Sequence, residues 1–380
     1  MKKIIITSAH YYDSPIQIGN HHFARLFARH GYEVLFLSNP ITPFHKFSSN
    51  QDSYKVKKEI HQKGGVKEKN ILSYVPASIV TPRNVPLLSS NWTLWNWDYF
   101  SYPSLSKKID EFGFSNVDII WMESLIFAPI LKKVSYKKMI CRIADDLLGF
   151  ENVTTKTFKN EIEVVKQADH IFFSSSIIME KYRSLFKDSS LKYIENGIDV
   201  DNFIRTSYQL PDEYKTIASP RVIYVGSIEN WFDEELIAKS AKELKDVNFI
   251  IIGPKTVKLN QLKHLKNVHL LGSKSFDILP NYLFFADVGI IPFDTIKHKT
   301  LIDGVNPLKL YEYLACGLPV VSTKWKTLEE LNPPIFMSND PGDFVSKLKQ
   351  ALESKKDQAS IDFALEKSWE KIFEKVQKFL

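Results

Sequence analysis

Short apolar runs alternate with amphipathic stretches along the whole chain. The runs are rich in Ile, Val, Leu and Phe and have the length of buried strands, whereas the stretches between them repeat apolar residues three or four positions apart, as helices do. The expected strands lie at residues 4–6, 34–37, 117–122, 139–143, 170–174, 191–194, 222–225, 249–252, 268–271, 288–291 and 320–321. Expected helices between them include residues 21–30, 161–167 and 234–243. This alternation predicts an α/β fold of parallel sheets with helices on both faces.

The series of strands is interrupted by a polar stretch over residues 205–220. A chain of 380 residues exceeds one ordinary core and suits two α/β domains. We therefore expect an N-terminal, doubly wound Rossmann-like domain over residues 1–205 and a C-terminal one over residues 206–365. The remaining residues 366–380 carry apolar side chains at helical spacing and predict a closing amphipathic helix.

Composition and charge narrow the class of protein. The two cysteines, Cys141 and Cys316, lie in apolar runs, which indicates reduced thiols and a cytoplasmic protein. The apolar run at residues 4–6 is too short for a signal peptide, and no run approaches the ~20 apolar residues that span a bilayer. The net charge of +6 suits phosphorylated small molecules, an anionic membrane surface or nucleic acid. No zinc-finger spacing or RNP-like signature accompanies it, so we expect no nucleic acid partner.

Residues 306–321 read NPLKLYEYLACGLPVV and contain the most informative pattern. Asn306 suits a helix N-cap, Pro307 suits the first helical residue and Gly317 suits the position just after the helix. The apolar residues that follow suit a buried strand. The sequence therefore predicts a short helix that leads into a strand.

Lys309 and Glu312 lie three residues apart on one face of this helix, within its first two turns. Unpaired backbone N–H groups and the helix dipole favour an anion at such a helix start. A diphosphate could dock there, with Lys309 adding charge and Glu312 accepting hydrogen bonds from ribose hydroxyls. The alternative is a solvated ion pair on an ordinary helix.

The same segment resembles the Pro-x-Lys-x-x-Glu-x-x-Ala-x-Gly-x-Pro-Val signature of GT-B glycosyltransferases related to family 4. It also resembles the nucleotide site of the glucuronosyltransferase of xanthan assembly and its exopolysaccharide relatives. Four more segments are similar to the family's interdomain motif, to its first donor-domain strand with a glycine turn and to two later strands: residues 196–199, 222–233, 267–272 and 287–293. Their common order and spacing make the resemblance specific.

The resemblance implies a GT-B fold, with two Rossmann-like domains facing a central cleft and a C-terminal helix that returns to the N-terminal domain. It implies a nucleotide-sugar donor in the C-terminal domain and an acceptor in the N-terminal domain. The donor-binding residues that it implies are Gly226, Ser273, Lys274, Phe293, Asp303, Pro307, Leu308, Lys309 and Glu312. Ser273 and Lys274 mark the loop whose backbone reads the nucleotide base in the family.

One position departs from the family pattern. Many family 4 enzymes carry a second acidic residue eight positions before the helix glutamate, and here that position is Gly304. The neighbouring Asp303 either substitutes for it or is a plain loop aspartate. The missing acid moves the chain towards the xanthan-type branch, whose enzymes invert the anomeric centre through an aspartate base.

Two carboxylates, Asp145 and Asp146, follow the expected strand at residues 139–143. One of them could accept the proton of the acceptor hydroxyl, because partial burial raises the pKa of a carboxylate into a useful range. The alternative is a cap on the following helix. Relatives keep an acidic residue at the position of Asp145, so the resemblance implies that Asp145 is the base.

The turn before the first expected helix lacks the Gly-x-Gly-x-x-Gly pattern of dinucleotide-binding oxidoreductases. It carries His21 and His22, which either line the acceptor side, approach the donor phosphates or simply cap the helix. His21 is a further candidate for the base. Neither histidine has a cysteine or histidine partner at ligand spacing, so we expect no metal site.

Six aromatic residues lie within residues 91–102. They could stack on sugars, sit at a membrane interface or form a small core under a long loop. Lysine-rich stretches at residues 55–69 and 132–138 could lie against anionic lipid or simply be solvated. Peripheral contact with the inner face of the membrane is one expectation, because acceptors in the related family are often lipid-linked.

Together these features predict a metal-independent hexosyl- or glucuronosyltransferase that uses a nucleotide-sugar, expected to be a UDP-sugar, and no cofactor. Lys309 and the helix start would take the charge that Mg²⁺ carries elsewhere. The acceptor would be a saccharide or a lipid-linked saccharide in exopolysaccharide or capsule assembly. Two alternatives stay open: a nucleotide-sugar 2-epimerase of the same fold, and a GT-B protein that has lost catalysis and serves as a scaffold.

Overall fold

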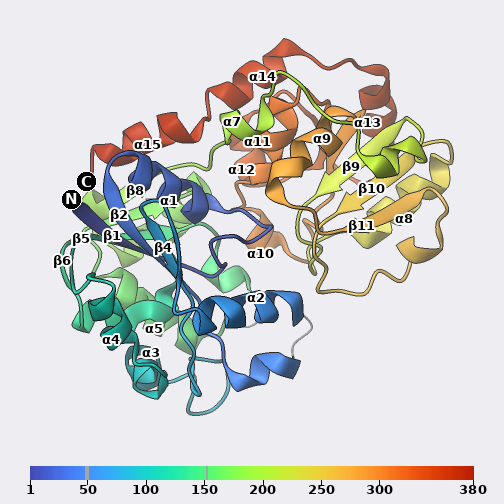
Figure 1. Cartoon of the computed structure of the whole chain (residues 1–380). Helices are drawn as coiled ribbons and strands as arrows, with labels where there is room; N and C mark the ends of the chain where they lie inside the picture. Colours follow the sequence, from blue (N-terminus) through green and yellow to red (C-terminus); the bar gives the residue numbers. More distant parts are fainter. Residues whose placement is uncertain (48–50, 151–152) are drawn as a thin grey trace. The chain divides into compact units, whose positions relative to one another are not determined.

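The computed structural model describes residues 1–47, 51–150 and 153–380. They form two compact units, residues 1–195 with 373–380 and residues 196–372 (Figure 1). Each unit is a largely parallel sheet with helices packed on it, which confirms the expected α/β fold class. The first unit ends at Glu195, whereas the polar stretch in the sequence placed the domain boundary near residue 205.

The strands of the first unit are β1 Lys2–Ser8, β2 Tyr32–Ser38, β3 Val66–Glu68, β4 Ile71–Tyr74, β5 Asn116–Met122, β6 Ser135–Ile143, β7 His170–Phe173 and β8 Leu191–Tyr193. They form one sheet in the order β3-β4-β2-β1-β5-β6-β7-β8, parallel except for the edge pair β3 and β4. The central strands are buried on both faces, which is why they stand out in the sequence as continuous apolar runs. The sequence pattern missed β3 and β4, because β3 has a single apolar residue and Ser73 interrupts the apolar residues of β4.

The helices of this unit are α1 Gly19–Arg29, α2 Gln51–Gln62, α3 Asn91–Asn96, α4 Leu105–Glu111, α5 Thr155–Val165 and α6 Ser176–Tyr182, with 3-10 helices η1 Pro43–Phe47, η2 Trp97–Phe100, η3 Leu125–Lys132, η4 Leu147–Gly149, η5 Arg183–Leu185 and η6 Asp188–Ser190. The end of the last helix, α15 Trp369–Gln377, also belongs to it. Phe373 packs edge-on against Phe27 with ring centroids 5.0 Å apart, and the Lys138 ammonium donates to the Phe379 carbonyl oxygen at 2.6 Å.

The second unit has the strands β9 Arg221–Val225, β10 Asn248–Ile252, β11 Val268–Gly272, β12 Val288–Ile291, β13 Val320–Thr323 and β14 Phe336–Ser338. They form a parallel sheet in the order β11-β10-β9-β12-β13-β14. Its helices are α7 Val200–Phe203, α8 Glu234–Glu243, α9 Leu279–Phe284, α10 Lys299–Ile302, α11 Leu308–Ala315, α12 Lys326–Leu331, α13 Pro341–Glu353 and α14 Gln358–Leu365, with η7 Asp212–Lys215, η8 Leu262–His264 and η9 Phe276–Ile278.

In each sheet the order of strands reverses direction, at β1 and β5 in the first unit and at β9 and β12 in the second. Loops at the carboxyl ends of the two strands then run to opposite sides and leave a crevice, which is where open α/β sheets bind ligands. The segments that follow these strand ends are therefore the places to look for a site.

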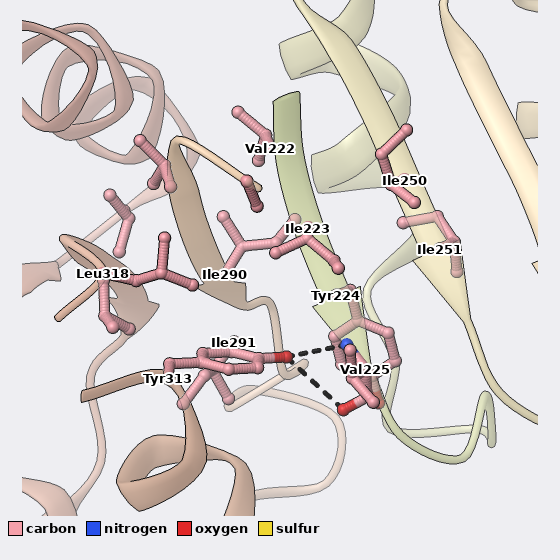
Figure 2. Close-up of a cluster of buried hydrophobic side chains, with 14 of the residues drawn as sticks. Val222, Ile223, Tyr224, Val225, Ile250, Ile251, Ile290, Ile291, Tyr313 and Leu318 are labelled. Carbon is pink, nitrogen blue, oxygen red and sulfur yellow. Dashed lines mark hydrogen bonds between the residues drawn. The ribbon is translucent and has the colours of Figure 1, made fainter. Parts of the chain in front are cut away.

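A buried tyrosine of α11 fixes the end of β9 at this reversal point (Figure 2). β9 and β12 pair through Val222 and Ile223, so further along β9 the two strands separate. There the Tyr313 hydroxyl accepts from the Val225 N–H at 2.7 Å and lies 3.4 Å from the Val225 carbonyl oxygen. Gly289 in β12 makes room, because a Cβ there would lie 2.6 Å from the Tyr313 ring. Helix α11 is thus attached to the end of β9 by a polar bond in an apolar core.

Tyr313→Phe should destabilise the second unit by roughly 1–3 kcal/mol, because the buried Val225 N–H loses its partner. Urea unfolding of the purified protein measures the change. Tyr102→Phe removes a hydroxyl from a side chain that is 86% exposed, and this control should unfold like the parent. Equal stability of Tyr313→Phe and the parent would show that this bond does not hold α11.

Candidate functional site

Helix α11 begins without a side-chain cap. Pro307 occupies the N-cap position and Leu308 is the first helical residue, so the prediction that Asn306 caps the helix is wrong. The Asn306 side chain instead accepts a hydrogen bond from the Tyr311 hydroxyl at 2.8 Å, and its backbone carbonyl accepts from the Asn196 amide at 2.7 Å. In the described structure the N-cap residue makes no side-chain cap hydrogen bond, and the Leu310 N–H donates to the Pro307 carbonyl oxygen at 3.1 Å. A helix start of this kind suits an anion.

The Lys309 side chain lies between two aromatic rings beside this helix start. Its ammonium is 5.1 Å from the centroid of the Tyr224 ring and 4.8 Å from that of Phe293. Gly226 allows this position, because a Cβ there would lie 2.8 Å from Lys309 Cε. Burial lowers the pKa of Lys309 to about 8, although the Glu312 charge opposes the shift. A positive charge that is costly to bury is thus held where an anion would stabilise it.

Glu312 lies one turn further along α11. Burial raises its pKa to about 7, the Lys309 charge opposes this shift and the Asp199 charge adds to it. Across the described part of the chain, Lys309 and Glu312 each lack an ion pair, including one with each other. The solvated i,i+3 pair is therefore not what the geometry shows, and Glu312 can accept hydrogen bonds from a ligand.

Three other predicted donor residues have different surroundings. Ser273 follows β11 and is exposed. The Lys274 ammonium pairs with Glu213 at 2.5 Å, and the Asp303 carboxylate pairs with Lys299 at 2.7 Å. Both charges already have partners on the protein. The surroundings of Asp303 are thus those of a plain loop aspartate, the alternative to a donor-binding acid.

The adjacent carboxylates of the first unit have opposite surroundings. Asp146 is buried, pairs with Lys181, accepts from the Tyr182 hydroxyl and caps η4 through the Leu148 N–H at 3.2 Å. Asp145 is partly exposed, and no hydrogen bond or ion pair reaches its carboxylate from the residues that the structure describes. Burial raises the pKa of Asp145, and the charge of Asp146 adds to this while that of Arg142 opposes it. Asp146 thus has the capping role, whereas the Asp145 carboxylate has no such partner among the described residues.

A buried ion pair that the sequence analysis missed lies next to Asp145. Arg142 at the end of β6 pairs with Glu123, the residue directly after β5. Its guanidinium lies 5.8 Å from the Phe23 ring and fills the space where a Cβ on Gly19 would come within 3.0 Å. The charged residue that ends the apolar run at 117–122 is the signal that could have pointed to this pair.

His21 has the capping role that was its alternative. Its Nδ1 accepts from the Ile18 N–H at 3.0 Å, and its Nε2 donates to the Tyr11 carbonyl oxygen at 3.0 Å. Burial lowers the pKa of His21 to about 3, so the ring is neutral with both nitrogens engaged. His22 is also buried and bonds the Arg25 guanidinium at 2.9 Å. Neither ring is placed to take a substrate proton.

The remaining predicted features concern metals and membranes. Within residues 1–47, 51–150 and 153–380, no three His, Cys, Asp or Glu side chains lie together as metal ligands would. In the same described residues, no helix is long and apolar enough to cross a bilayer. The aromatic residues at 91–102 differ in exposure, since Trp97 is buried and Trp92 is 59% exposed.

Solved structures share this fold over the whole chain. Sucrose-phosphate synthase from Thermosynechococcus elongatus aligns over 100% of this chain and 98% of its own, with a TM-score of 0.71 and 13% identity. Anabaena HepE in complex with UDP-glucose aligns over 100% and 99%, with a TM-score of 0.67 and 12% identity. At these identities the likeness shows the fold alone, and that fold is GT-B.

Two sequence families match the chain, one in each of its two units. Residues 6–174 match the family described as glucuronosyltransferase GumK, N-terminal domain, and residues 219–354 match the family described as glycosyl transferases group 1. The chain is a glycosyltransferase, and its fold is GT-B. This confirms the family resemblance that the sequence motifs indicated.

A curated relative of this GT-B glycosyltransferase is the putative teichuronic acid biosynthesis glycosyltransferase TuaH of Bacillus subtilis (strain 168). The two are 26% identical over 235 residues, and the alignment covers 58% of each chain. The match thus spans little more than half the length of that relative.

Proposed function

We propose that this glycosyltransferase binds a UDP-sugar in its second unit and transfers the sugar to a saccharide or lipid-linked acceptor in exopolysaccharide or capsule assembly. The observation that carries the proposal is the uncapped start of α11, beside which Lys309 and Glu312 have no ion-pair partner among the described residues. The UDP-glucose bound to HepE and the teichuronic acid biosynthesis in the description of TuaH support this donor and this class of product.

The donor would bind through its diphosphate and its ribose. The diphosphate would accept hydrogen bonds from the first N–H groups of α11 and lie beside the Lys309 ammonium. The negative charge of the diphosphate would keep Lys309 protonated. Glu312 would accept hydrogen bonds from the ribose hydroxyls. Because these groups already stabilise the charge that develops on the departing UDP, the proposed reaction uses no metal ion and no cofactor.

Asp145 would accept the proton of the attacking acceptor hydroxyl. Burial raises its pKa, which makes its carboxylate a stronger base than an exposed one. The acceptor oxygen bonds to the anomeric carbon, the bond from this carbon to the UDP oxygen breaks, and UDP leaves with the bonding electron pair. Attack from the face opposite UDP inverts the anomeric centre.

Two alternatives share this fold. A nucleotide-sugar 2-epimerase would convert the donor without an acceptor, and an inactive scaffold would bind the donor and leave it unchanged. Incubation with a UDP-sugar alone, followed by addition of an acceptor, separates all three. An epimerase would convert the UDP-sugar before the acceptor is added, a transferase would consume it once the acceptor is present, and a scaffold would leave it unchanged.

Lys309→Ala should weaken UDP binding at neutral pH by roughly 2–3 kcal/mol, the scale of a lost charge-assisted hydrogen bond. In the parent, UDP affinity should fall as the pH rises above about 8, because the pKa of Lys309 in the free protein lies there and deprotonation removes its charge. Lys309→Arg stays protonated and should keep its affinity through that range. Calorimetric titrations on both sides of pH 8 measure these changes, and unchanged UDP affinity of Lys309→Ala would remove Lys309 from the site.

Asp145→Asn should lower turnover by about 10² to 10⁴, because the amide cannot take a proton, while UDP affinity and melting temperature stay near the parent's. Asp146→Asn should lower the melting temperature, because that carboxylate holds Lys181, Tyr182 and the start of η4. Steady-state assays and thermal unfolding measure the two effects. Full turnover of Asp145→Asn would exclude it as the base.

The proposal includes peripheral contact with an anionic membrane. Tyr99 is 70% and Tyr102 is 86% exposed on the first unit. Lys132 and Lys133 lie over the rings of Trp95 and Tyr99, 4.7 and 4.5 Å from their centroids. Exposed aromatic rings beside cations suit the headgroup region of a bilayer with anionic lipid.

The protein should therefore sediment with anionic vesicles at low salt and be released as the salt approaches 1 M, where the Debye length shrinks to about 3 Å. Replacing Tyr99 and Tyr102 together by serine should reduce sedimentation at low salt. Ile296→Ser changes an apolar side chain that is 85% exposed in the second unit and serves as the control. No sedimentation of the parent at low salt would favour a soluble acceptor.

A further inference from the structure

The first unit contains a cavity of about 160 Å³ that none of the roles above uses. One wall comes from the segment before α3 and the other from α5, and the residues that carry the argument are Leu88, Ser89, Leu94, Asn160 and Glu161. The Asn160 amide donates to the Ser89 carbonyl oxygen at 3.2 Å and so links the two walls. A cavity of about 150 Å³ holds one benzene molecule, so this one is the size of a six-membered ring.

Glu161 is the group in this cavity that the fold does not explain. Its Oε2 is buried, and none of the described residues hydrogen-bonds to it. Burial raises the pKa of Glu161 to about 7. A buried acceptor without a partner is costly, so a residue with a purely structural role would be expected to have one. A ligand with hydroxyl groups would provide it.

Both walls of the cavity come, in the chain, after the carboxyl ends of strands of the sheet that carries Asp145. Its first wall belongs to the loop that follows the carboxyl end of β4, and α5 follows the carboxyl end of β6 and the loop with Asp145 and Asp146. Loops at this edge of a parallel sheet form its ligand site. The cavity is therefore placed to receive a part of the acceptor that lies beyond the reacting hydroxyl.

The residues that line the cavity indicate which class of ligand it would bind. An apolar ring would leave Glu161 without a partner, and an anionic ring would meet its carboxylate. Arg83 lines the rim, but its guanidinium donates to Thr42 Oγ1 at 2.9 Å and lies over the Phe44 ring. A neutral pyranose has hydroxyl donors for a carboxylate and C–H faces for Leu88 and Leu94.

We propose that this cavity binds a neutral pyranose ring of the acceptor glycan, next to the ring whose hydroxyl attacks the donor, and that Glu161 accepts hydrogen bonds from its hydroxyls. The place in the acceptor rests on the proposed transfer reaction. Binding of the ring itself does not, and it can be measured without turnover.

Saturation-transfer NMR with methyl glucoside, methyl galactoside and methyl mannoside tests the binding, and methyl glucuronide tests the preference for a neutral ring. At least one neutral glycoside should receive saturation from the parent protein, and Glu161→Leu should abolish this without lowering the melting temperature. Glu163→Leu, which changes an exposed glutamate of the same helix, is the matched control and should keep the signal. No signal from any neutral glycoside, a stronger signal from the glucuronide, or a lower melting temperature with an unchanged signal in Glu161→Leu would overturn the proposal.

Transfer assays then test the place of the ring. The ratio of kcat/KM for a disaccharide acceptor to that for a monosaccharide acceptor should fall roughly 10- to 100-fold in Glu161→Leu, the scale of a lost hydrogen bond to a charged group. An unchanged ratio would overturn the placement. Absence of transfer to every acceptor, with the NMR signal intact, would contradict the proposed function and leave the ring site standing.

Discussion

The second unit of this protein depends on the hydrogen bonds between the Tyr313 hydroxyl and the backbone of Val225. At the reversal point β9 and β12 separate, and the polar backbone at the end of β9 would otherwise remain unpaired in an apolar core. The bond attaches α11 to the strand end, and the absence of a side chain at Gly289 lets the helix come close enough. Lys309, one turn earlier on α11, is thereby held beside the loop that follows β9.

The two charges at this helix start pair neither with each other nor with another described residue. Lys309 lies against aromatic faces, and Glu312 is partly buried close to it, yet neither has an ion pair in the described structure. Burial disfavours both charged forms, which is why the pKa of Lys309 is lowered and that of Glu312 is raised. An anion beside Lys309 and hydroxyl donors at Glu312 would relieve both costs at once.

The first unit shows how surroundings separate chemically identical groups. Asp146 is held by Lys181, Tyr182 and a backbone N–H, so it serves the fold, whereas Asp145 one residue earlier has no such partner and a raised pKa. The same comparison draws attention to Glu161, since a buried carboxylate oxygen without a partner is expensive wherever it occurs. Asp145 and Glu161 both follow the carboxyl end of β6 in the chain.

The sequence alone determined the class of fold, because buried parallel strands must be continuous apolar runs. It also determined that Lys309 and Glu312 lie on one helix, because their spacing is a local property. It did not determine which of Asp145 and Asp146 is free, that His21 caps α1, or that Pro307 rather than Asn306 begins α11. It also gave no sign of β14 or of the Arg142–Glu123 pair. The role of Asp146 and the Arg142–Glu123 pair depend on partners that lie far along the chain, and only tertiary packing brings such groups together. The partners of His21 are close in the chain, but only the folded loop places them at its ring nitrogens and sets the burial that lowers its pKa.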